Sequence, residues 1–359
     1  MKVCFLNHSA DAKTGSGRFF SELIAALRQR VPQLEYKVLT HDDVLPTSFF
    51  KALWSLPRLR RIFSGYEIIH ALDGWPFGVL ALLALIGLNK KLVITAIGTG
   101  AVQPLYYPLK RWLLAWAYRR AARLVAVSNN TKQEILKVLP KLSISVINHG
   151  VAADRFSSLG KKSSEFNEWK PYILTAGALK KRKGMEYVVR AFAIAARQLT
   201  KLRLVIYGRG PEHRPLLALA QELGVADRVV FPFYDSGLKD ISDERLTALY
   251  RNAELFILLP QDIHKDIEGF GLVLLEAAAC GLPVIGARDS GAEDGLIDGY
   301  NGYLVAPTDA GQAAARMQAI LTDPKLHEKF SANSVSFAKK MSWDKAATAY
   351  LNLYEHLNQ

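Results

Sequence analysis

The sequence predicts an α/β protein made of two doubly wound domains. Along the 359 residues, short apolar segments alternate with longer amphipathic segments of helical period, which is the pattern of parallel sheets with covering helices. The order of these elements restarts near the middle of the chain, and the length suits two such sheets better than one. We therefore expect two Rossmann-like domains that face a cleft.

The predicted strands are short apolar runs bounded by polar or turn-forming residues. In the first half they lie at Lys2–Leu6, Tyr36–Leu39, Ile68–Ala71, Leu92–Ala96, Leu124–Val127 and Ile144–Asn148. In the second half they lie at Tyr172–Ala176, Leu202–Tyr207, Val229–Phe231, Leu255–Leu258, Pro283–Ile285 and Gly302–Val305. A helix from about Gly17 to Arg30 is expected to follow the first strand.

A polar stretch from Ala153 to Lys170 separates the two halves, and its centre, residues 157–164, is rich in serine and lysine. This composition is typical of an interdomain linker. We expect a first domain at residues 1–160, a second at 161–341 and an amphipathic helix at 342–359.

The excess positive charge belongs entirely to the first half of the chain. Residues 1–165 contain 23 Lys and Arg against 10 Asp and Glu, a difference of +13, whereas residues 166–359 contain 23 of each kind. A basic domain of this kind favours an anionic partner such as a membrane surface or an acidic glycan. Nucleic acid is not expected, because the basic segments contain no groove-reading motif.

The cysteine content and the apolar runs indicate a cytoplasmic protein. Cys4 and Cys280 lie far apart in the sequence, which predicts neither a disulfide frame nor a zinc site. The segment Met1–Leu6 has the pattern of a strand and not that of a signal peptide. The longest apolar run, from Gly78 to Leu88, is too short to span a bilayer.

The segment from Glu268 to Glu276 is the most informative part of the sequence. A turn at residues 269–271 should place backbone N–H groups at the start of a helix, with Glu276 about one and a half turns into that helix. The N-terminus of a helix favours phosphate, and a carboxylate accepts hydrogen bonds from paired sugar hydroxyls. This arrangement fits a ligand with hydroxyls at both ends and phosphate between them, such as a nucleotide sugar.

Together with its continuation from Ala277 to Ile285, this segment resembles the E-x7-E signature of the retaining GT-B glycosyltransferases. It resembles most closely the family 4, group 1 transferases of bacterial lipopolysaccharide, capsule and exopolysaccharide synthesis. The resemblance implies that Glu276 binds the ribose and that the C-terminal helix crosses back to pack on the first domain. It also implies that the transferred hexose and the phosphate are held by Glu268 and by the N–H groups of Gly269, Phe270, Gly271 and Leu272.

Four consecutive cations, from Lys180 to Lys183, precede Gly184 at the expected start of a helix. The helix macrodipole disfavours cations at this position, and such a local conflict indicates an anionic ligand. The resemblance assigns Lys183 to the donor phosphates. It also implies an Arg after the strand glycine, Gly177, but Ala178 stands there, and we expect Arg182 or Lys181 to substitute for it.

Two glycine-containing regions complete the expected donor site. Between the first strand and the first helix, Gly15, Ser16 and Gly17 resemble the family loop that lines the donor phosphate and the acceptor, since glycines permit close backbone approach. The resemblance also implies that the nucleobase lies against the loop containing Gly208 and Gly210. The loop after Phe231 is the second base loop, and there Pro232 replaces the usual glycine.

One departure from the family pattern concerns the reacting centre. Ile97 occupies the position where the family often has a His near the transferred sugar. His8, at the end of the first strand, and His149 are the candidates to supply an imidazole instead. In the family, retention is usually explained by attack on the face that the phosphate leaves, so no protein nucleophile is required.

Two segments of the first domain mix basic and large apolar residues, Phe49–Phe63 and Tyr106–Arg120. Basic amphipathic stretches with Trp and Phe favour an anionic interface, and Trp112 and Trp116 should share one helix face. We expect a peripheral protein at the inner face of the cytoplasmic membrane, although ordinary core packing would also explain both segments.

The sequence thus favours a transferase that moves a hexose from a UDP- or GDP-sugar to a glycan or a lipid-linked acceptor. No D-x-D motif is present, and the cations at 180–183 can replace a metal at the diphosphate, so we expect no metal requirement. The alternatives are another GT-B enzyme, such as a sugar-nucleotide epimerase or an α-glucan synthase, or a nucleotide-sugar-binding protein without turnover. A dehydrogenase is disfavoured because the Gly15-x-Gly17 run lacks the third glycine.

Overall fold

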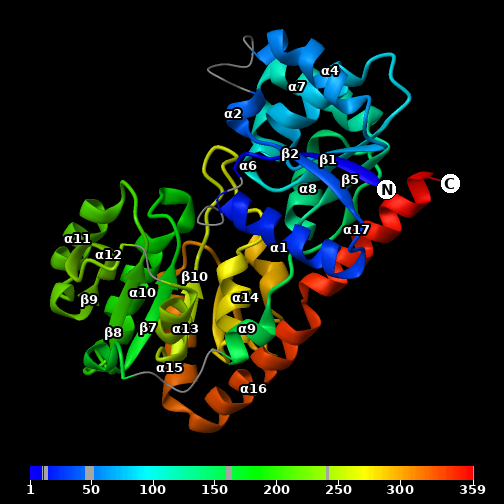
Figure 1. The fold of residues 1–359 in the computed structure, drawn as a ribbon. Coiled ribbons are helices and arrows are strands. Elements are labelled where there is room, and N and C mark those ends of the chain that lie inside the picture. The colour runs from blue at the N-terminus through cyan, green and yellow to red at the C-terminus, as the bar shows by residue number, and fades with distance from the viewer. Residues whose placement is uncertain (10, 12–14, 45–51, 159–163, 240–241, 359) are drawn as a thin grey trace. The chain divides into compact units, whose positions relative to one another are not determined.

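The computed structural model describes residues 1–9, 11, 15–44, 52–158, 164–239 and 242–358 (Figure 1). The chain divides into two compact units. The first consists of Met1–Gly150, His264–Gly269 and Trp343–Gln359, and the second of Val151–Ile263 and Phe270–Ser342. A short segment from the second half of the chain therefore belongs to the first unit, which its position in the sequence does not reveal.

The first unit contains a parallel six-stranded sheet in the order β2-β1-β3-β4-β5-β6. Its strands are β1 (Lys2–Leu6), β2 (Glu35–Leu39), β3 (Ile68–Ala71), β4 (Lys91–Ala96), β5 (Arg123–Ala126) and β6 (Ser145–Val146). The strand order reverses between β1 and β3, which makes this pair the topological switch point of the sheet. Ligands of open α/β sheets bind outside the carboxyl ends of the strands at such a point.

The α-helices of the first unit are α1 (Gly15–Arg30), α2 (His41–Val44), α4 (Leu56–Phe63), α5 (Val79–Leu85), α6 (Thr99–Val102), α7 (Pro108–Arg120), α8 (Asn129–Val138) and α17 (Trp343–Asn358). Short 3₁₀ segments occur at η1 (Leu53–Ser55) and η3 (Gln103–Tyr106), and a π-helical turn, η2 (Gly74–Gly78), follows β3.

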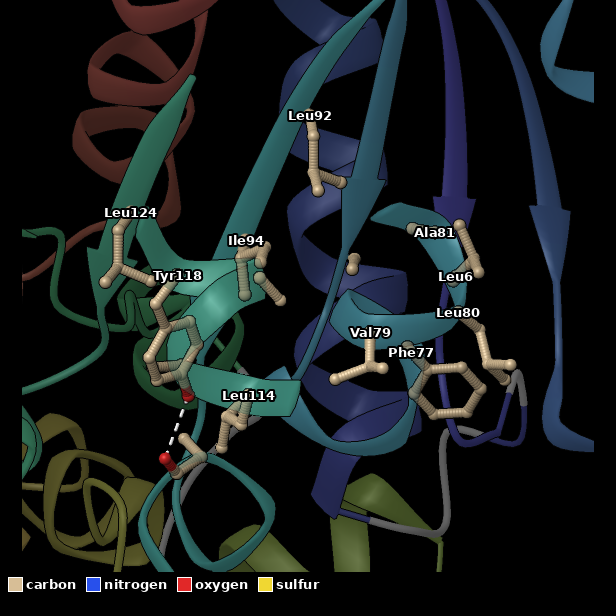
Figure 2. Packing of buried hydrophobic residues seen from close by; sticks show 14 of the residues in the cluster. Leu6, Phe77, Val79, Leu80, Ala81, Leu92, Ile94, Leu114, Tyr118 and Leu124 are labelled. Atoms are coloured by element: carbon tan, nitrogen blue, oxygen red, sulfur yellow. Dashed lines mark hydrogen bonds between the residues drawn. The ribbon is translucent and has the colours of Figure 1, made fainter. Parts of the chain in front are cut away.

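One core cluster of the first unit lies between the sheet and helices that include α5 and α7. Figure 2 shows Leu6 of β1 and Ile94 of β4 packed with the side chains of these two helices. Tyr118 of α7 is buried, and its hydroxyl donates a hydrogen bond of 2.8 Å to the carbonyl oxygen of Ala101 (Figure 2). This bond satisfies the polar end of an otherwise apolar side chain, as buried tyrosines require.

Helix α17 packs along α1, as the red and blue helices of Figure 1 show. A buried polar cluster also joins α17 to the sheet. His70 of β3 makes hydrogen bonds to the hydroxyls of Tyr354 (2.6 Å) and Thr95 (2.7 Å), and the Thr95 hydroxyl lies 3.1 Å from that of Tyr350. Burial lowers the pKa of His70 to about 3, so the ring is neutral at neutral pH.

The second unit contains another parallel six-stranded sheet, in the order β12-β11-β10-β7-β8-β9. Its strands are β7 (Tyr172–Ala176), β8 (Arg203–Tyr207), β9 (Val229–Val230), β10 (Leu255–Leu258), β11 (Val284–Ala287) and β12 (Gly302–Val305). Here the strand order reverses between β7 and β10, so the loops after these two strands border the switch point.

The α-helices of the second unit are α9 (Ala153–Ser158), α10 (Met185–Ala195), α11 (His213–Glu222), α12 (Pro232–Asp235), α13 (Asp243–Arg251), α14 (Leu272–Ala279), α15 (Ala310–Thr322) and α16 (Pro324–Lys340). Its 3₁₀ segments are η4 (Asn167–Trp169), η5 (Lys181–Lys183), η6 (Ala226–Arg228) and η7 (Gly291–Gly295).

The predicted α/β class and all of the predicted strands are confirmed, with ends shifted by a few residues. The predicted linker from Ala153 to Lys170 is only partly right. It contains α9, which packs on α14 and α16, and the buried side chain of Trp169, stacked on Phe166 at 5.0 Å. These apolar contacts bind both ends of the stretch to the second unit, whereas residues 159–163 lie outside the described part of the chain.

Candidate functional site

The switch point of the second sheet is bordered by a tightly packed set of loops. Gly177 follows β7, and Gly208 follows β8, with φ angles of 138° and 151°. A Cβ on Gly208 would lie 1.8 Å from the carbonyl oxygen of Gly177, so a residue with a side chain cannot occupy this position without displacing the backbone. The two loops therefore form a surface of bare backbone at the carboxyl ends of β7 and β8.

The side chain of Lys183 lies over this backbone surface. It is only 8% exposed, and a Cβ on Gly177 would lie 3.6 Å from its Cε and 3.8 Å from its Nζ. The loop that carries it is fixed to the end of β10, because the N–H of Gln261 donates a 2.7 Å hydrogen bond to the Arg182 carbonyl. A buried ammonium beside exposed backbone is suited to bind an anion.

The other cations of this loop differ in burial. Arg182 is half-buried, whereas Lys180 and Lys181 are exposed. Ala178, which occupies the expected Arg position, is exposed as well. Within the described residues, no three His, Cys, Asp or Glu side chains gather in a way that could hold a metal ion.

The loops after β8 and β9 are connected by Tyr234 of α12. The N–H of Gly210 donates a 3.1 Å hydrogen bond to the Tyr234 hydroxyl, and the ring of Tyr234 stacks on His213 at 3.6 Å between centroids. Pro232, which replaces the expected glycine, is the first residue of α12. The two loops predicted to contact a nucleobase thus lie together in the structure, and they present an aromatic pair that the sequence analysis did not identify.

The turn before α14 has the predicted form. Gly271 is in the left-handed conformation (φ 76°) as the N-cap, Leu272 begins the helix, and the ring of Phe270 is buried. Glu276, on the same helix, is 4% exposed, and one of its carboxylate oxygens accepts a 2.9 Å hydrogen bond from the Tyr250 hydroxyl. Tyr250 lies on α13, so the sequence alone does not reveal this contact with Glu276.

Glu268 belongs to the first unit, unlike Glu276. Its segment is held by hydrogen bonds from the Thr99 hydroxyl to the Asp266 carboxylate (2.6 Å) and from the Thr131 hydroxyl to the Gly269 carbonyl (3.3 Å). A Cβ on Gly269 would lie 1.7 Å from the carbonyl oxygen of Ile97, so only glycine fits there. The Glu268 side chain itself is 9% exposed.

His149 is near Glu268 and is buried between two aromatic rings. Its ring lies 4.6 Å from that of Phe19 and 6.0 Å from that of Trp343. Burial lowers the pKa of His149 to about 3, against the opposing effect of the Glu268 carboxylate. A neutral ring enclosed in this way is typical of a packing role, so the structure disfavours His149 as a replacement for the histidine missing at Ile97.

Gly15, Ser16 and Gly17, predicted to line the donor phosphate and the acceptor, lie at the start of a helix, and residues 12–14 before them are outside the described part of the chain. They make up the first turn of α1, which begins at Gly15. The Asn7 side-chain amide donates a 3.2 Å hydrogen bond to the Ser16 carbonyl and a 2.7 Å bond to the Ser9 carbonyl. The bond to Ser16 connects the end of β1 to the start of the helix.

Comparison with known proteins connects this geometry to a family. Residues 158–336 match the family model of "Glycosyl transferases group 1", and residues 15–155 match that of "Glycosyltransferase Family 4". A GDP-mannose-dependent α-(1-6)-phosphatidylinositol monomannoside mannosyltransferase of Mycolicibacterium smegmatis is 28% identical over 75% of this chain and 71% of its own length. D-inositol 3-phosphate glycosyltransferase 2 of Catenulispora acidiphila is 31% identical over 65% of this chain and 56% of its own length.

Among solved structures, Anabaena HepE in complex with UDP matches 99% of this chain and 100% of its own, with a TM-score of 0.80 and 17% identity. This likeness concerns the fold, and together with the two parallel sheets it defines the GT-B class. Within that class, the two family models cover most of the sequence. The chain belongs to the glycosyltransferases of family 4, group 1.

Proposed function

We propose that this glycosyltransferase moves a hexose from a nucleoside-diphosphate sugar to a hydroxyl of a glycan or lipid-linked acceptor, with retention of anomeric configuration. The observation that carries the proposal is the buried ammonium of Lys183 over the glycine backbone at the switch point of the second sheet. The diphosphate needs a fixed cation and N–H donors, and this loop supplies both.

The other predicted site residues are assigned to the remaining parts of the nucleotide sugar. Arg182 supports Lys183 on the phosphates, and Gly15–Gly17, at the start of α1, offer N–H donors in the first unit. Glu276, held by Tyr250, accepts hydrogen bonds from the ribose hydroxyls, and Gly177, Gly208 and Gly210 admit the nucleoside. Glu268 and the N–H groups of residues 269–272 hold the hexose and its phosphate.

The reaction conserves atoms without a protein nucleophile. The acceptor oxygen forms a bond to the anomeric carbon while the bond from that carbon to the diphosphate oxygen breaks. The proton of the acceptor hydroxyl passes to the departing phosphate oxygen on the same face of the sugar. Lys183 and Arg182 neutralise the charge that develops on the leaving group, which is the task that a metal ion performs in other transferases, so we propose no metal requirement.

The nucleotide is UDP or GDP. One relative is named for its use of GDP-mannose, and HepE was solved with UDP, so the relatives support both classes of donor. The bacterial transferases of this kind that act on lipid-linked acceptors suggest a role in cell-surface polysaccharide or glycolipid synthesis, and this role is part of the proposal.

The test is a screen of UDP- and GDP-sugars by thermal shift in the presence of EDTA, followed by an assay for slow release of free nucleotide. Stabilisation by one nucleotide class together with nucleotide release would support a metal-independent transferase. Stabilisation without release would favour the alternative of a binding protein without turnover, for which Ala178 and Ile97 are the motivating departures. A thermal shift that appears only after a divalent cation is added would contradict the role given to Lys183.

We also propose that the first unit docks on an anionic membrane. The start of α7 and the preceding η3 segment expose a group of large side chains together with cations: Tyr106, Tyr107, Leu109, Lys110, Arg111 and Trp112. Trp112 is 67% exposed and stacks on Trp116, and Leu109 is 65% exposed. Apolar side chains beside cations suit the boundary between headgroups and acyl chains.

The basic segment Phe49–Phe63 presents a similar surface. Arg58, Arg60 and Arg61 of α4 are exposed, and Trp54 is 89% exposed, whereas Leu59 and Phe63 are buried in the core. Helix α5 packs against both α4 and α7, and residues 49–51 lie outside the described part of the chain. Within that described part, no helix is both long and apolar enough to cross a membrane. We therefore propose peripheral attachment at the inner face of the cytoplasmic membrane.

A further inference from the structure

The switch point of the first sheet carries a histidine–carboxylate pair that the assignments above do not use. Leu6 of β1 and Ala71 of β3 are register partners, and His8 and Asp73 each lie two residues beyond them. His8 Nε2 is 3.7 Å from Asp73 Oδ2, with side-chain exposures of 42% and 9%. The pair thus joins a buried carboxylate to an accessible imidazole at the position where open α/β sheets bind ligands.

The backbone of Asp73 is strained. Its φ and ψ angles are 152° and 157°, a region that is almost exclusive to glycine. Packing holds it there: the Asp73 carboxylate accepts a 2.8 Å hydrogen bond from the Gly74 N–H, and a Cβ on Gly74 would lie 2.2 Å from the Tyr118 hydroxyl. Strain of this kind persists where the surrounding structure over-determines it, and it concentrates at functional sites.

The neighbouring loop leaves room for the carboxylate. Gly100, in the first turn after β4, lies so close that a Cβ there would be 2.3 Å from Asp73 Oδ2. This is the same loop in which Ile97 stands at the expected His position. The chain therefore lacks an imidazole after β4 but accommodates beside that loop a carboxylate that faces an imidazole from β1.

His8 is positioned on several sides. Its backbone N–H donates a 2.9 Å hydrogen bond to the Asn7 side-chain oxygen, and its backbone carbonyl accepts a bond from the backbone N–H of His41. Its ring packs edge-on against the ring of Phe77, with 4.7 Å between centroids. The 3.7 Å separation from Asp73 is longer than a hydrogen bond, and catalytic separations of this kind often shorten when substrate binds.

We propose that His8 and Asp73 hold the acceptor hydroxyl: one ring nitrogen of His8 accepts the hydroxyl's hydrogen bond, and Asp73 fixes the ring through the other. The inference rests on the proposed transfer reaction. His8 is then a catalytic residue that orients the attacking oxygen, and Asp73 is a positioning residue. The bond changes are those of the proposed reaction, with the acceptor proton passing to the departing phosphate oxygen, so the pair ends each turnover in its starting protonation state.

The experiment compares three variants with the wild type. Asp73→Asn keeps the shape and the acceptor for the Gly74 N–H but removes the charge, His8→Phe keeps a ring against Phe77 but removes both nitrogens, and His8→Gln restores an acceptor. The matched controls are His41→Phe and Asp42→Asn, since His41 and Asp42 form a similar pair at 3.5 Å that is exposed to solvent.

Two quantities are measured with the nucleotide sugar that the wild type binds: its affinity, and the release of free nucleotide with water or glycerol as the attacking hydroxyl. We expect Asp73→Asn and His8→Phe to slow release by about 10- to 100-fold, as for the loss of an orienting contact, while donor affinity stays within about twofold. His8→Gln should recover part of the rate, and both control variants should match the wild type.

The outcomes separate the two proposals. A wild type that binds no nucleotide sugar would overturn the proposed function and this inference together. Donor binding with unchanged release in Asp73→Asn and His8→Phe would overturn only the inference. A wild type that binds donor but releases no nucleotide with either hydroxyl would count against the transfer reaction and would overturn the inference with it.

Asp73→Gly gives a second, independent readout, because glycine adopts the strained backbone conformation without cost. If Asp73 is a positioning residue, this variant should keep its melting temperature and lose the rate. A lowered melting temperature with the rate per folded molecule unchanged would show a purely structural role and overturn the inference.

Discussion

The switch points of the two sheets have similar topology but different chemistry. In the second unit, the carboxyl ends of the strands are covered by glycine backbone and a buried cation, Lys183. In the first unit, the same place holds polar side chains, with Asn7 and His8 after β1 and Asp73 after β3. Bare backbone with a cation suits a diphosphate, whereas an imidazole backed by a carboxylate suits a hydroxyl. We infer that the same fold provides two sites with different tasks.

The E-x7-E segment shows the same division on a smaller scale. Glu268 belongs to the first unit, whereas Glu276 belongs to the second and accepts a hydrogen bond from the Tyr250 hydroxyl. One short motif therefore contributes a carboxylate to each unit. A change at either glutamate should act through its own unit, and the following predictions use this separation.

The largest effect is expected for Lys183→Ala. Removing the buried ammonium takes away the cation that the leaving diphosphate needs most in the transition state, so nucleotide release should fall by about 100- to 1,000-fold. Lys181→Ala is the matched control, since Lys181 is exposed on the same loop. The rate of release is measured with saturating donor. Equal rates for both variants would contradict the role given to Lys183 and, with it, the proposed difference between the two switch points.

The second prediction concerns membrane binding by the first unit. Replacing Arg58, Arg60 and Arg61 with Ser should weaken binding to phosphatidylglycerol vesicles by about 100-fold at low ionic strength, since each cation near an anionic surface contributes about fivefold. The control replaces three exposed cations of the second unit, Arg197, Lys201 and Arg214. Cosedimentation measures the affinity. If the control variant loses as much vesicle affinity as the variant of Arg58, Arg60 and Arg61, membrane binding is not specific to the first unit.

The third prediction is that Glu276→Ala weakens donor affinity by about 10- to 100-fold, because the ribose loses a charged hydrogen-bond acceptor. The fall in turnover at saturating donor should be smaller than that of Lys183→Ala. Tyr250→Phe should give a weaker form of the same defect, since it removes one hydrogen bond that orients the carboxylate but keeps the carboxylate itself. Titration calorimetry measures both affinities, and unchanged donor binding in Glu276→Ala would contradict the ribose assignment.

The smallest effect is a pH dependence of stability in the first unit. Burial lowers the pKa of His70 to about 3, whereas an unfolded histidine titrates near 6.5. Between these values the unfolded chain binds a proton that the native state does not, so stability falls as pH decreases from about 6.5, by about 1.4 kcal/mol per pH unit. His70→Gln should remove that part of the slope, and urea midpoints at several pH values measure it. Identical slopes in both proteins would show that the pKa of His70 is not lowered in the native state.

Much of the fold could be predicted from the sequence, because parallel strands buried on both faces appear as continuous apolar runs. The ends of the weakest strands could not: β6 and β9 are only two residues long, and pairing with a neighbouring strand decides their extent. The helix α9 was missed for a related reason. Its contacts with α14 and α16 come from residues more than a hundred positions away.

The candidate site was predictable where the chemistry is local. Lys183 and Glu276 stand in recognisable segments, and their roles remain predictions that the experiments above test. Lys183 is buried and Lys181 is exposed, and this difference depends on how their loop packs. The loop packs closely on the end of β10, which is distant in sequence: a Cβ on Gly184 would lie 1.6 Å from the Leu259 carbonyl oxygen. Asp73 was missed because its strained backbone is invisible in sequence, although a carboxylate two residues after a buried strand was a usable signal.

The most direct test of the central claim, that the second unit binds a nucleoside diphosphate without a metal, is titration of UDP and GDP into the wild type, Lys183→Ala and His8→Phe in EDTA. We predict that one nucleotide binds the wild type and His8→Phe equally, and that Lys183→Ala binds it at least about tenfold more weakly. Equal binding by wild type and Lys183→Ala, or no binding of either nucleotide without a divalent cation, would contradict the claim.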